Sequence, residues 1–264
     1  MIDMIDAQTR LLCILGNPVY HSKSPLLHNY WISQCGFNLV YCAFNVCDLK
    51  SAICGLRALN FMGANLTIPH KIEVLQYIDS LDDEAHDAGA VNMIVNDDGE
   101  LYGYNTDIYG INQTLDVSGR TVAIIGAGGA ARAACKAFDT NDIFVVNRTF
   151  QRAKRLEKEF SCTAEPLKNL DAVVAQSDVI VNATSIGMFP HVEDTIVPKK
   201  SLHSHHMVLD TIYNPPITRL LRDAQSQGAT IFSGLEMFLH QALKSFQIWT
   251  GILPDYEDSW NVLS

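Results

Sequence analysis

The stretch TVAIIGAGGAARAA, residues 121–134, joins a short β-branched apolar run to an alanine-rich helical pattern through a glycine-rich turn. Gly126, Gly128 and Ala131 form the pattern G-x-G-x-x-A within it. The first glycine permits a tight bend, the second lets a pyrophosphate approach the backbone, and the third small residue lets the helix pack close to the strand. The phosphates would lie on free N–H groups at the start of the helix. The stretch therefore predicts a dinucleotide site on a doubly wound sheet.

Length and composition limit the class of protein. The chain has 264 residues, 48% of them hydrophobic, which suits one large or two small domains with buried cores. No apolar run approaches the ~18 residues of a membrane span, and the opening MIDMIDAQTR lacks the basic residues of a secretory signal. The net charge of −10 argues against nucleic acid or an anionic membrane as a partner. We expect a soluble cytoplasmic protein that binds a small molecule.

The cysteines and a histidine cluster could suggest disulfides or a metal. Seven cysteines form no C-x-x-C pair, so we expect reduced and mostly buried thiols. His203, His205 and His206 lie in the run HSHH, which lacks a third ligand at helical or zinc-finger spacing. The run is therefore expected to be a solvent loop, and no metal is predicted.

The first hundred residues alternate strand-like and helix-like patterns, the syntax of an α/β domain. Strands are predicted at residues 11–15, 39–46 and 64–68, and a hairpin at 91–95 and 100–104 around Asn96-Asp97-Asp98-Gly99. Helices are predicted at residues 25–34 and 48–59, with Pro25 at the first helical position. Another helix is expected to start at Pro69, with Ile72, Leu75 and Ile78 as its apolar stripe.

A short helix at residues 108–115 is predicted to lead into the second domain, which opens with the glycine-rich turn. Its further strands are expected at 143–146, 179–182, 208–209 and 230–232, with a helix at 151–160. A last helix at 234–249, with Met237, Gln241, Lys244 and Ile248 on one face, is expected to return to the first domain. The predicted fold is an N-terminal α/β domain, residues 1–109 with 238–264, and a Rossmann-like domain, residues 110–237.

Two groups of first-domain residues could act on a ligand. Ser22 and Ser24, between a strand end and a helix start, could hold a carboxylate, although Ser24 could equally be an ordinary N-cap. Lys71 falls in the first turn of a helix, where the macrodipole lowers a lysine pKa, whereas Asp107 would favour its charged form. A Lys71/Asp107 pair could shuttle a proton. The alternative is a surface lysine and a solvated aspartate.

Arginines stand where an NAD-preferring enzyme carries an acid after the second strand of its nucleotide-binding domain. Arg148 and Arg152 offer two guanidinium groups for a 2′-phosphate, which a ribose diol would leave unpaired. This favours NADP. The alternative is a charged helix face, since residues 151–160 carry many charges that need no ligand.

Nine motifs taken in order resemble the shikimate dehydrogenase family along nearly the whole chain. They are GNPVYHSKSPLLHN, NLTIPHK, GAVN, YNTDIYG, IIGAGGAARA, VNRT, NATSIGM, DTIYNPP and GLEMFLHQALKSFQIWTG. The resemblance implies NADP-dependent interconversion of 3-dehydroshikimate and shikimate, in aromatic amino-acid biosynthesis, by a monomer or homodimer. It also supplies the carboxylate that the two serines would bind.

The resemblance assigns roles position by position. It implies that Lys71 and Asp107 are the catalytic pair. The implied substrate-binding residues are Ser22, Ser24, Thr67, Asn92, Asp107, Tyr213 and Gln241. The implied NADP-binding residues are Gly126, Ala127, Gly128, Gly129, Ala130, Ala131, Asn147, Arg148, Thr149, Arg152, Thr184, Ser185, Met188 and Gly234.

One position departs from the family pattern. Met93 stands where the family usually has threonine, so a thioether replaces a hydroxyl near the ring, and we expect an effect on affinity or hydroxyl selectivity. Ser24, in place of threonine, resembles the members that prefer shikimate. The alternatives are a quinate or aminoshikimate dehydrogenase, and a catalytically silent NADPH-sensing protein. The presence of Lys71 and Asp107 weighs against the sensor, which needs neither.

Overall fold

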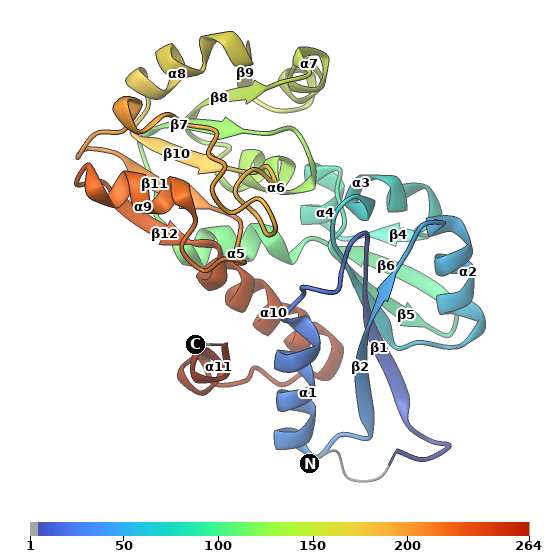
Figure 1. Cartoon of the computed structure of the whole chain (residues 1–264). Coiled ribbons are helices and arrows are strands. Elements are labelled where there is room, and N and C mark those ends of the chain that lie inside the picture. The colour runs from blue at the N-terminus through green and yellow to red at the C-terminus, as the bar shows by residue number, and fades with distance from the viewer. Residues whose placement is uncertain (1–4, 264) are drawn as a thin grey trace. The chain divides into compact units, whose positions relative to one another are not determined.

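The computed structural model describes residues 5–263 (Figure 1). The chain divides into two compact units, Met1–Thr106 with Gln241–Ser264, and Asp107–His240. Each unit is built around its own six-stranded sheet. This confirms the predicted fold class, an α/β substrate-type domain and a Rossmann-like domain.

The first unit contains a mixed sheet with the strand order β2-β1-β3-β5-β6-β4. Its strands are β1 (Arg10–Gly16), β2 (Leu39–Asn45), β3 (Gly63–Leu66), β4 (Ser80–Leu81), β5 (Met93–Asp97) and β6 (Glu100–Tyr104). Its helices are α1 (Ser24–Cys35), α2 (Leu49–Ala58), α3 (His70–Glu73), the 3-10 turn η1 (Val74–Tyr77), α4 (Asp83–Ala88) and α11 (Tyr256–Leu263). Only β5 runs antiparallel to its neighbours, because β1, β2, β3, β4 and β6 all share one direction.

The hairpin between β5 and β6 forms as predicted. Its two-residue loop consists of Asp98 and Gly99, whose φ angles are +48° and +93°. Positive φ at both positions is the requirement of a type I′ turn, which explains the glycine and the short polar residue before it. The Gly99 N–H also donates to Asn96 Oδ1 at 2.9 Å, closing the turn.

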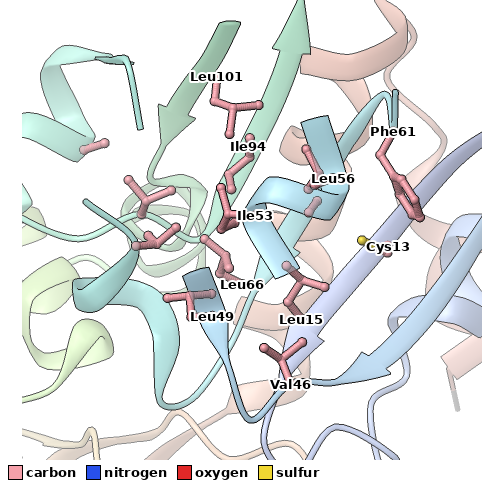
Figure 2. Close-up of a cluster of buried hydrophobic side chains, with 14 residues drawn as sticks. Cys13, Leu15, Val46, Leu49, Ile53, Leu56, Phe61, Leu66, Ile94 and Leu101 are labelled. Carbon is pink, nitrogen blue, oxygen red and sulfur yellow. The ribbon is translucent and has the colours of Figure 1, made fainter. Parts of the chain in front are cut away.

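One face of this sheet is covered by α2, η1 and α4 through the cluster of side chains drawn in Figure 2. Cys13 and Leu15 of β1 point into it, together with Ile53 of α2 and Ile94 of β5. Side chains alternate along a strand, so Leu12 and Ile14 of β1 lie on the opposite face. Both are buried there, which accounts for the continuous apolar run of a strand covered on both sides.

The second unit contains an all-parallel sheet with the order β12-β11-β10-β7-β8-β9. Its strands are β7 (Thr121–Ile125), β8 (Asp142–Asn147), β9 (Cys162–Pro166), β10 (Val179–Asn182), β11 (Met207–Asp210) and β12 (Thr230–Ser233). Its helices are α5 (Thr106–Thr114), α6 (Gly129–Ala137), α7 (Phe150–Glu159), η2 (Leu167–Asn169), α8 (Leu170–Gln176), η3 (Lys199–Ser201) and α9 (Arg219–Ser226). Read from β9, the order is the 3-2-1-4-5-6 of a Rossmann fold, with its switch point between β7 and β10.

The last long helix, α10 (Gly234–Thr250), passes from the second unit into the first, as predicted. Trp249 Nε1 donates to Ile94 O of β5 at 3.0 Å. The face predicted from the spacing of Met237, Gln241, Lys244 and Ile248 is not the most buried face of this helix. Ala242, Phe246 and Trp249 are buried, whereas Gln241 and its predicted neighbours Lys244 and Ile248 are only half-buried. The larger aromatic side chains take the interior and displace the polar face from it.

The helix predicted to start at Pro69 is much shorter than expected. It has one turn, α3, followed by the 3-10 turn η1. Ile72 is 40% exposed, while Val74 is fully buried. Leu75 and Ile78 of the predicted stripe pack against the core cluster, so only Ile72 departs from it, and Val74 of η1 joins the cluster as well.

The histidine run HSHH is less exposed than expected. His206 is buried, so only two of the three histidines of the HSHH run, His203 and His205, are exposed as a solvent loop requires. The His203 N–H donates to His206 Nδ1 at 3.0 Å, which folds the ring inward.

All seven cysteines are free thiols, as predicted, but only Cys13 and Cys135 are buried. Cys35, Cys42 and Cys162 are half-buried, and Cys47 and Cys54 are exposed.

No helix within residues 5–263 has the length and apolarity required to cross a bilayer. Over the same residues, no group of three histidine, cysteine, aspartate or glutamate side chains is arranged to hold a metal ion.

Candidate active site

Segments of the first unit that carry predicted site residues meet at one edge of its sheet. The segments after β1, β3 and β6 contain Ser24, Thr67 and Thr106, and these three strands are parallel. Asn92 precedes β5, which runs the opposite way, so it lies at the same edge. Ligands of open α/β sheets collect at the carboxyl ends of the strands. The topology therefore brings together residues that are far apart in sequence.

The serine loop after β1 is tied down by its own backbone and by α11. The Ser22 N–H donates to Val19 O at 3.0 Å, and the Ser24 N–H donates to Ser22 Oγ at 3.2 Å. Lys23 Nζ donates to Leu263 O of α11 at 2.8 Å. This lysine is therefore held away from a ligand at the serines.

The alternative that Ser24 is an ordinary N-cap is wrong. Lys23 occupies the N-cap position, and Ser24 is the first residue of α1. Ser24 is 3% exposed, and its hydroxyl forms no hydrogen bond with any residue between 5 and 263. A buried hydroxyl next to the N–H groups of a helix start suits a carboxylate ligand.

Lys71 lies in the turn α3, which follows Thr67 directly after β3. Its carbonyl accepts the Val91 N–H at 2.8 Å, and the preceding His70 is buried with Nε2 3.1 Å from Val46 O. These bonds fix the backbone that carries the half-buried lysine. Because α3 has only four residues, its macrodipole is weaker than the predicted helix would supply.

Asn92, Thr106 and Gln241 form one hydrogen-bonded cluster. The Thr106 N–H donates to Asn92 Oδ1 at 2.8 Å, and Asn92 Nδ2 donates to Thr106 Oγ1 at 2.9 Å. Asn92 Nδ2 also lies 3.4 Å from Gln241 Oε1. Asn92 is 2% exposed, so both ends of its amide are fixed inside the protein. The structure thus joins two predicted substrate residues, Asn92 and Gln241, through Thr106.

Asp107 follows Thr106 in the first turn of α5 and is 3% exposed. A buried carboxylate at this position does not fit the alternative of a solvated aspartate. Asp107 begins the second unit, whereas Lys71 belongs to the first. Their action as a pair stays a prediction.

Sequence reasoning missed three members of this polar cluster: Asn65, Thr106 and Ser245. All three are at most 5% exposed. Tyr41 Oη donates to Asn65 Oδ1 at 2.7 Å, and Asn65 Nδ2 lies 3.3 Å from Ser245 Oγ. The available signal was an asparagine in the middle of the buried run GANL of β3, because buried polar groups in a strand need partners.

Met93 is fully buried in β5, opposite Asn65 of β3. Directly opposed residues of antiparallel strands place their side chains on the same face, so the thioether packs beside the Asn65 amide. A side chain with no exposed surface does not touch a ligand directly. Any influence of Met93 on substrate affinity is therefore indirect, through neighbours such as Asn65.

We expect Met93→Thr to destabilise the protein by about 1 to 3 kcal/mol, because it opens a cavity and buries a hydroxyl. The KM for shikimate should change more than the KM for NADP, and by no more than ~1.5 kcal/mol, which is roughly tenfold. Urea unfolding and initial rates measure the two effects. Met93→Leu conserves volume and is the control. An effect confined to the KM for NADP would contradict this placement.

The glycine turn of the second unit runs from the end of β7 into α6. Gly126 has φ +125°, and a Cβ added there would meet Ala183 O at 2.7 Å, so no other residue fits without displacing the backbone. A Cβ at Gly128, by contrast, would meet no atom within 4 Å. The turn is closed toward β10 and open at the helix start. This open side fits a pyrophosphate on the first N–H groups of α6, including those of Gly129 and Ala130.

Arg148 and Arg152 follow β8, the strand next to β7, and both are exposed. Neither side chain forms an ion pair or hydrogen bond with any residue in the part of the chain that the structure describes. Asn147 Nδ2 donates to Thr149 O at 2.9 Å, and the Arg152 N–H donates to Thr149 O, so the turn that carries the arginines is ordered. Their guanidinium groups are accessible to an anionic ligand.

The segment after β10 carries Thr184, Ser185 and Met188, and Asn182 organises its start. Asn182 Oδ1 accepts from Thr184 Oγ1 at 2.7 Å, and Asn182 Nδ2 donates to Asp210 Oδ1 at 3.0 Å. Asp210 at the end of β11 also accepts from Thr218 Oγ1 at 2.6 Å. These buried bonds connect the loops after two neighbouring strands.

Tyr213 and Gly234 lie after the next strand ends. The Tyr213 ring packs on Phe238 with centroids 4.6 Å apart. A Cβ at Gly234 would meet Asp210 O at 2.6 Å and Ile212 O at 2.5 Å, so this position admits only glycine. All the predicted cofactor residues of this unit thus lie beyond the carboxyl ends of its parallel strands.

The buried carboxyl of Asp210 should make stability depend on pH. Burial raises its pKa from the usual 3.8 to about 6, although hydrogen bonds from Thr218, Ile212 and Asn182 oppose this change. A carboxyl whose pKa is raised by folding stabilises the fold below its unfolded pKa, and this stabilisation is lost as the pH rises through about 6. The full difference corresponds to about 3 kcal/mol.

We therefore expect Asp210→Asn to become more stable relative to the wild type, by about 2 to 3 kcal/mol, between about pH 4 and about pH 7. Urea unfolding of both proteins at the two pH values measures this change, and the contributions of other carboxyls cancel in the comparison. A difference that stays constant with pH would show that Asp210 keeps an ordinary pKa.

Sequence models of three domains match the chain in the order of its elements. They are the shikimate dehydrogenase substrate binding domain at residues 14–94, shikimate/quinate 5-dehydrogenase at 111–216, and the shikimate 5′-dehydrogenase C-terminal domain at 234–263.

Curated relatives are similar over nearly the full length. The shikimate dehydrogenase (NADP(+)) of Methanococcus maripaludis is 40% identical, with 96% of this chain and 95% of the relative aligned. The enzyme of the same name from Pyrococcus furiosus is 41% identical, with the same coverage. A crystal structure of the Thermus thermophilus shikimate 5-dehydrogenase, in complex with NADP(H) and shikimate, superposes with a TM-score of 0.87. It is 32% identical and covers 96% of this chain and 98% of its own.

Proposed function

The chain belongs to the shikimate dehydrogenase family, and we propose that it interconverts 3-dehydroshikimate and shikimate with NADP(H). The observation that carries this proposal is the group of polar residues at one end of the first sheet. Ser24 and Lys71 follow the parallel strands β1 and β3, and Asn92 precedes the antiparallel strand β5. The reaction places the protein in the shikimate pathway of aromatic amino-acid biosynthesis.

In this proposal one domain binds the substrate and the other binds the cofactor. Residues 1–109 with 238–264 bind the substrate, and residues 110–237 bind NADP. Ser22 and Ser24 hold the substrate carboxylate, while Thr67, Asn92 and Gln241 hold the ring hydroxyls. Tyr213, which is half-buried in the second unit, is included among the substrate-binding residues because it matches the family pattern.

Lys71 supplies the acid–base chemistry. In the oxidation direction its amine takes the proton of the 3-hydroxyl, and in reduction its ammonium returns that proton to the oxygen. Asp107 is the proposed partner that orients Lys71. NADP, when bound, accepts or donates the hydride. Because Asn92 and Asp107 are almost completely buried, they are fixed before the substrate arrives.

The residues of the second unit fit NADP. The open helix start at Gly128 and Gly129 receives the pyrophosphate, and the accessible Arg148 and Arg152 receive the 2′-phosphate. Thr184, Ser185, Met188 and Gly234 complete the cofactor side. The cytoplasmic location and the monomeric or homodimeric state remain predictions.

The test is turnover by the purified chain. Shikimate with NADP+ should produce the reduced cofactor, followed by its absorbance, and quinate or NAD+ should support a lower kcat/KM. A higher kcat/KM with quinate would assign a quinate dehydrogenase. Absence of turnover with shikimate, quinate and aminoshikimate would overturn the enzymatic proposal and favour an NADPH-sensing protein, which cofactor binding without turnover would support.

A further inference from the structure

Ser245 is a fully buried serine on α10, at the centre of the polar cluster of the first unit. Its Oγ lies 3.0 Å from Thr106 Oγ1, 3.3 Å from Asn65 Nδ2 and 2.9 Å from Gln241 O. A serine in a helix often bonds the carbonyl four residues back, so the last contact alone is unremarkable. The two contacts to other elements are not explained by helix geometry.

The available hydrogens allow one arrangement of these bonds in which Ser245 is fully satisfied. A hydroxyl has one hydrogen and two lone pairs. If Ser245 donates to Gln241 O, then it accepts from both Asn65 Nδ2 and Thr106 Oγ1. Thr106 has then used its only hydroxyl hydrogen, and its oxygen accepts from Asn92 Nδ2 at 2.9 Å. This arrangement satisfies the shortest distances at the same time, and it uses every donor and acceptor of Ser245.

Ser245 also contacts the two residues at which the first unit ends. The chain leaves this unit after Thr106, immediately before Asp107, and returns at Gln241. Ser245 bonds the side chain of Thr106 and the backbone of Gln241. Asp107 is the next residue after Thr106, so the hydrogen bonds of the Thr106 N–H and hydroxyl restrain the backbone from which Asp107 continues.

We propose that Ser245 is a positioning residue for the substrate site: it fixes Thr106, the residue to which Asp107 is joined, relative to Asn92 and Gln241 of the same unit. The inference rests on the proposed function for the roles of Asp107, Asn92 and Gln241. Ser245 acts through these residues and does not itself touch the substrate.

Ser245→Ala is tested against Ser259→Ala, a matched control. Ser259 is also fully buried in a helix of the same unit, bonds the carbonyl of Asp255 four residues back, and accepts from Trp31 Nε1 at 2.8 Å. Both substitutions remove a buried hydroxyl with a comparable set of partners. A purely structural role predicts similar consequences for the two variants.

We expect Ser245→Ala to lower kcat for shikimate oxidation by roughly three- to tenfold and to leave the KM for NADP unchanged. Ser259→Ala should keep the wild-type kcat. The effect should depend on Thr106. The double variant Ser245→Ala/Thr106→Val should have about the same kcat as the less active of the two single variants, because both substitutions remove the same hydrogen bond. Additive losses, or equal kcat in the two serine variants, would overturn the proposal.

A second measurement does not require activity. The Thr106 N–H donates to Asn92 Oδ1, so its hydrogen exchange reports on the pairing directly. Exchange at Thr106 should be accelerated by roughly tenfold in Ser245→Ala and little changed in Ser259→Ala. Unchanged exchange would overturn the positioning role. If the wild type does not turn over shikimate, the proposed function fails, while the exchange result still decides whether Ser245 orders Thr106.

Discussion

Lys71→Ala is expected to lower kcat for shikimate oxidation by roughly two to four orders of magnitude, with little change in shikimate affinity. The physical reason is that the 3-hydroxyl must lose its proton as the hydride leaves, and general acid–base catalysis usually contributes this much. The carboxylate and the other hydroxyls keep their partners, so binding in the ground state is retained. The measurement is kcat and KM from initial rates, with affinity from equilibrium titration.

Two further variants separate proton transfer from charge. Lys71→Arg keeps a cation but cannot be deprotonated, so it should be nearly as inactive as Lys71→Ala. Lys50→Ala removes an exposed lysine from α2 of the same unit and should keep wild-type kinetics. A near-wild-type kcat in Lys71→Ala would remove this lysine from the mechanism. An active Lys71→Arg would leave it only an electrostatic role.

The order of strands and helices could be predicted because most elements are covered by others and carry a clear apolar period. β4 and β9 were not predicted, and each is one of the two edge strands of its sheet. Edge strands are covered less, so Ser80–Leu81 and the run CTAEP of β9 lack the apolar pattern of central strands. The turn at Asp98-Gly99, by contrast, was predictable from local backbone chemistry alone.

The candidate site could be predicted only in part, for a related reason. Ser24 and the residues of NLTIPHK stand at strand ends that a strand–helix reading can place. The partners of the buried polar groups come from distant elements: Asn65 and Ser245 are 180 residues apart, and Thr106 and Ser245 are 139 apart. No local pattern specifies such a pair. Met93 shows the same limit, since only the sheet register reveals that it packs beside Asn65.

Arg148→Ala and Arg152→Ala are each expected to raise the KM for NADP by roughly ten- to a hundredfold, because a hydrogen bond to a charged group contributes ~1.5 to 3 kcal/mol. The KM for NAD should barely change, since its ribose diol offers the guanidinium groups nothing comparable. Both arginines are exposed and follow the strand next to the glycine turn, where a 2′-phosphate would lie. The measurement is kcat/KM for both cofactors in each variant.

Arg155→Ala is the matched control for this test. Arg155 is exposed on the same helix, α7, and carries the same charge as Arg152. It lies further along the helix, away from the end of β8. If the arginines act only through a general positive potential, the KM for NADP should rise alike in all three variants. If Arg148 and Arg152 bind the 2′-phosphate directly, as a phosphate clamp, then Arg155→Ala should keep the wild-type KM. Added salt should weaken NADP binding in the wild type more than in the clamp variants, because an exposed ion pair is screened while backbone contacts of the glycine turn are screened less. Two results would contradict the assignment: a wild type that prefers NAD, or three variants that all keep the wild-type ratio of kcat/KM for NADP over NAD. In either case Arg148 and Arg152 belong to a solvated helix face, and the cofactor preference has another origin.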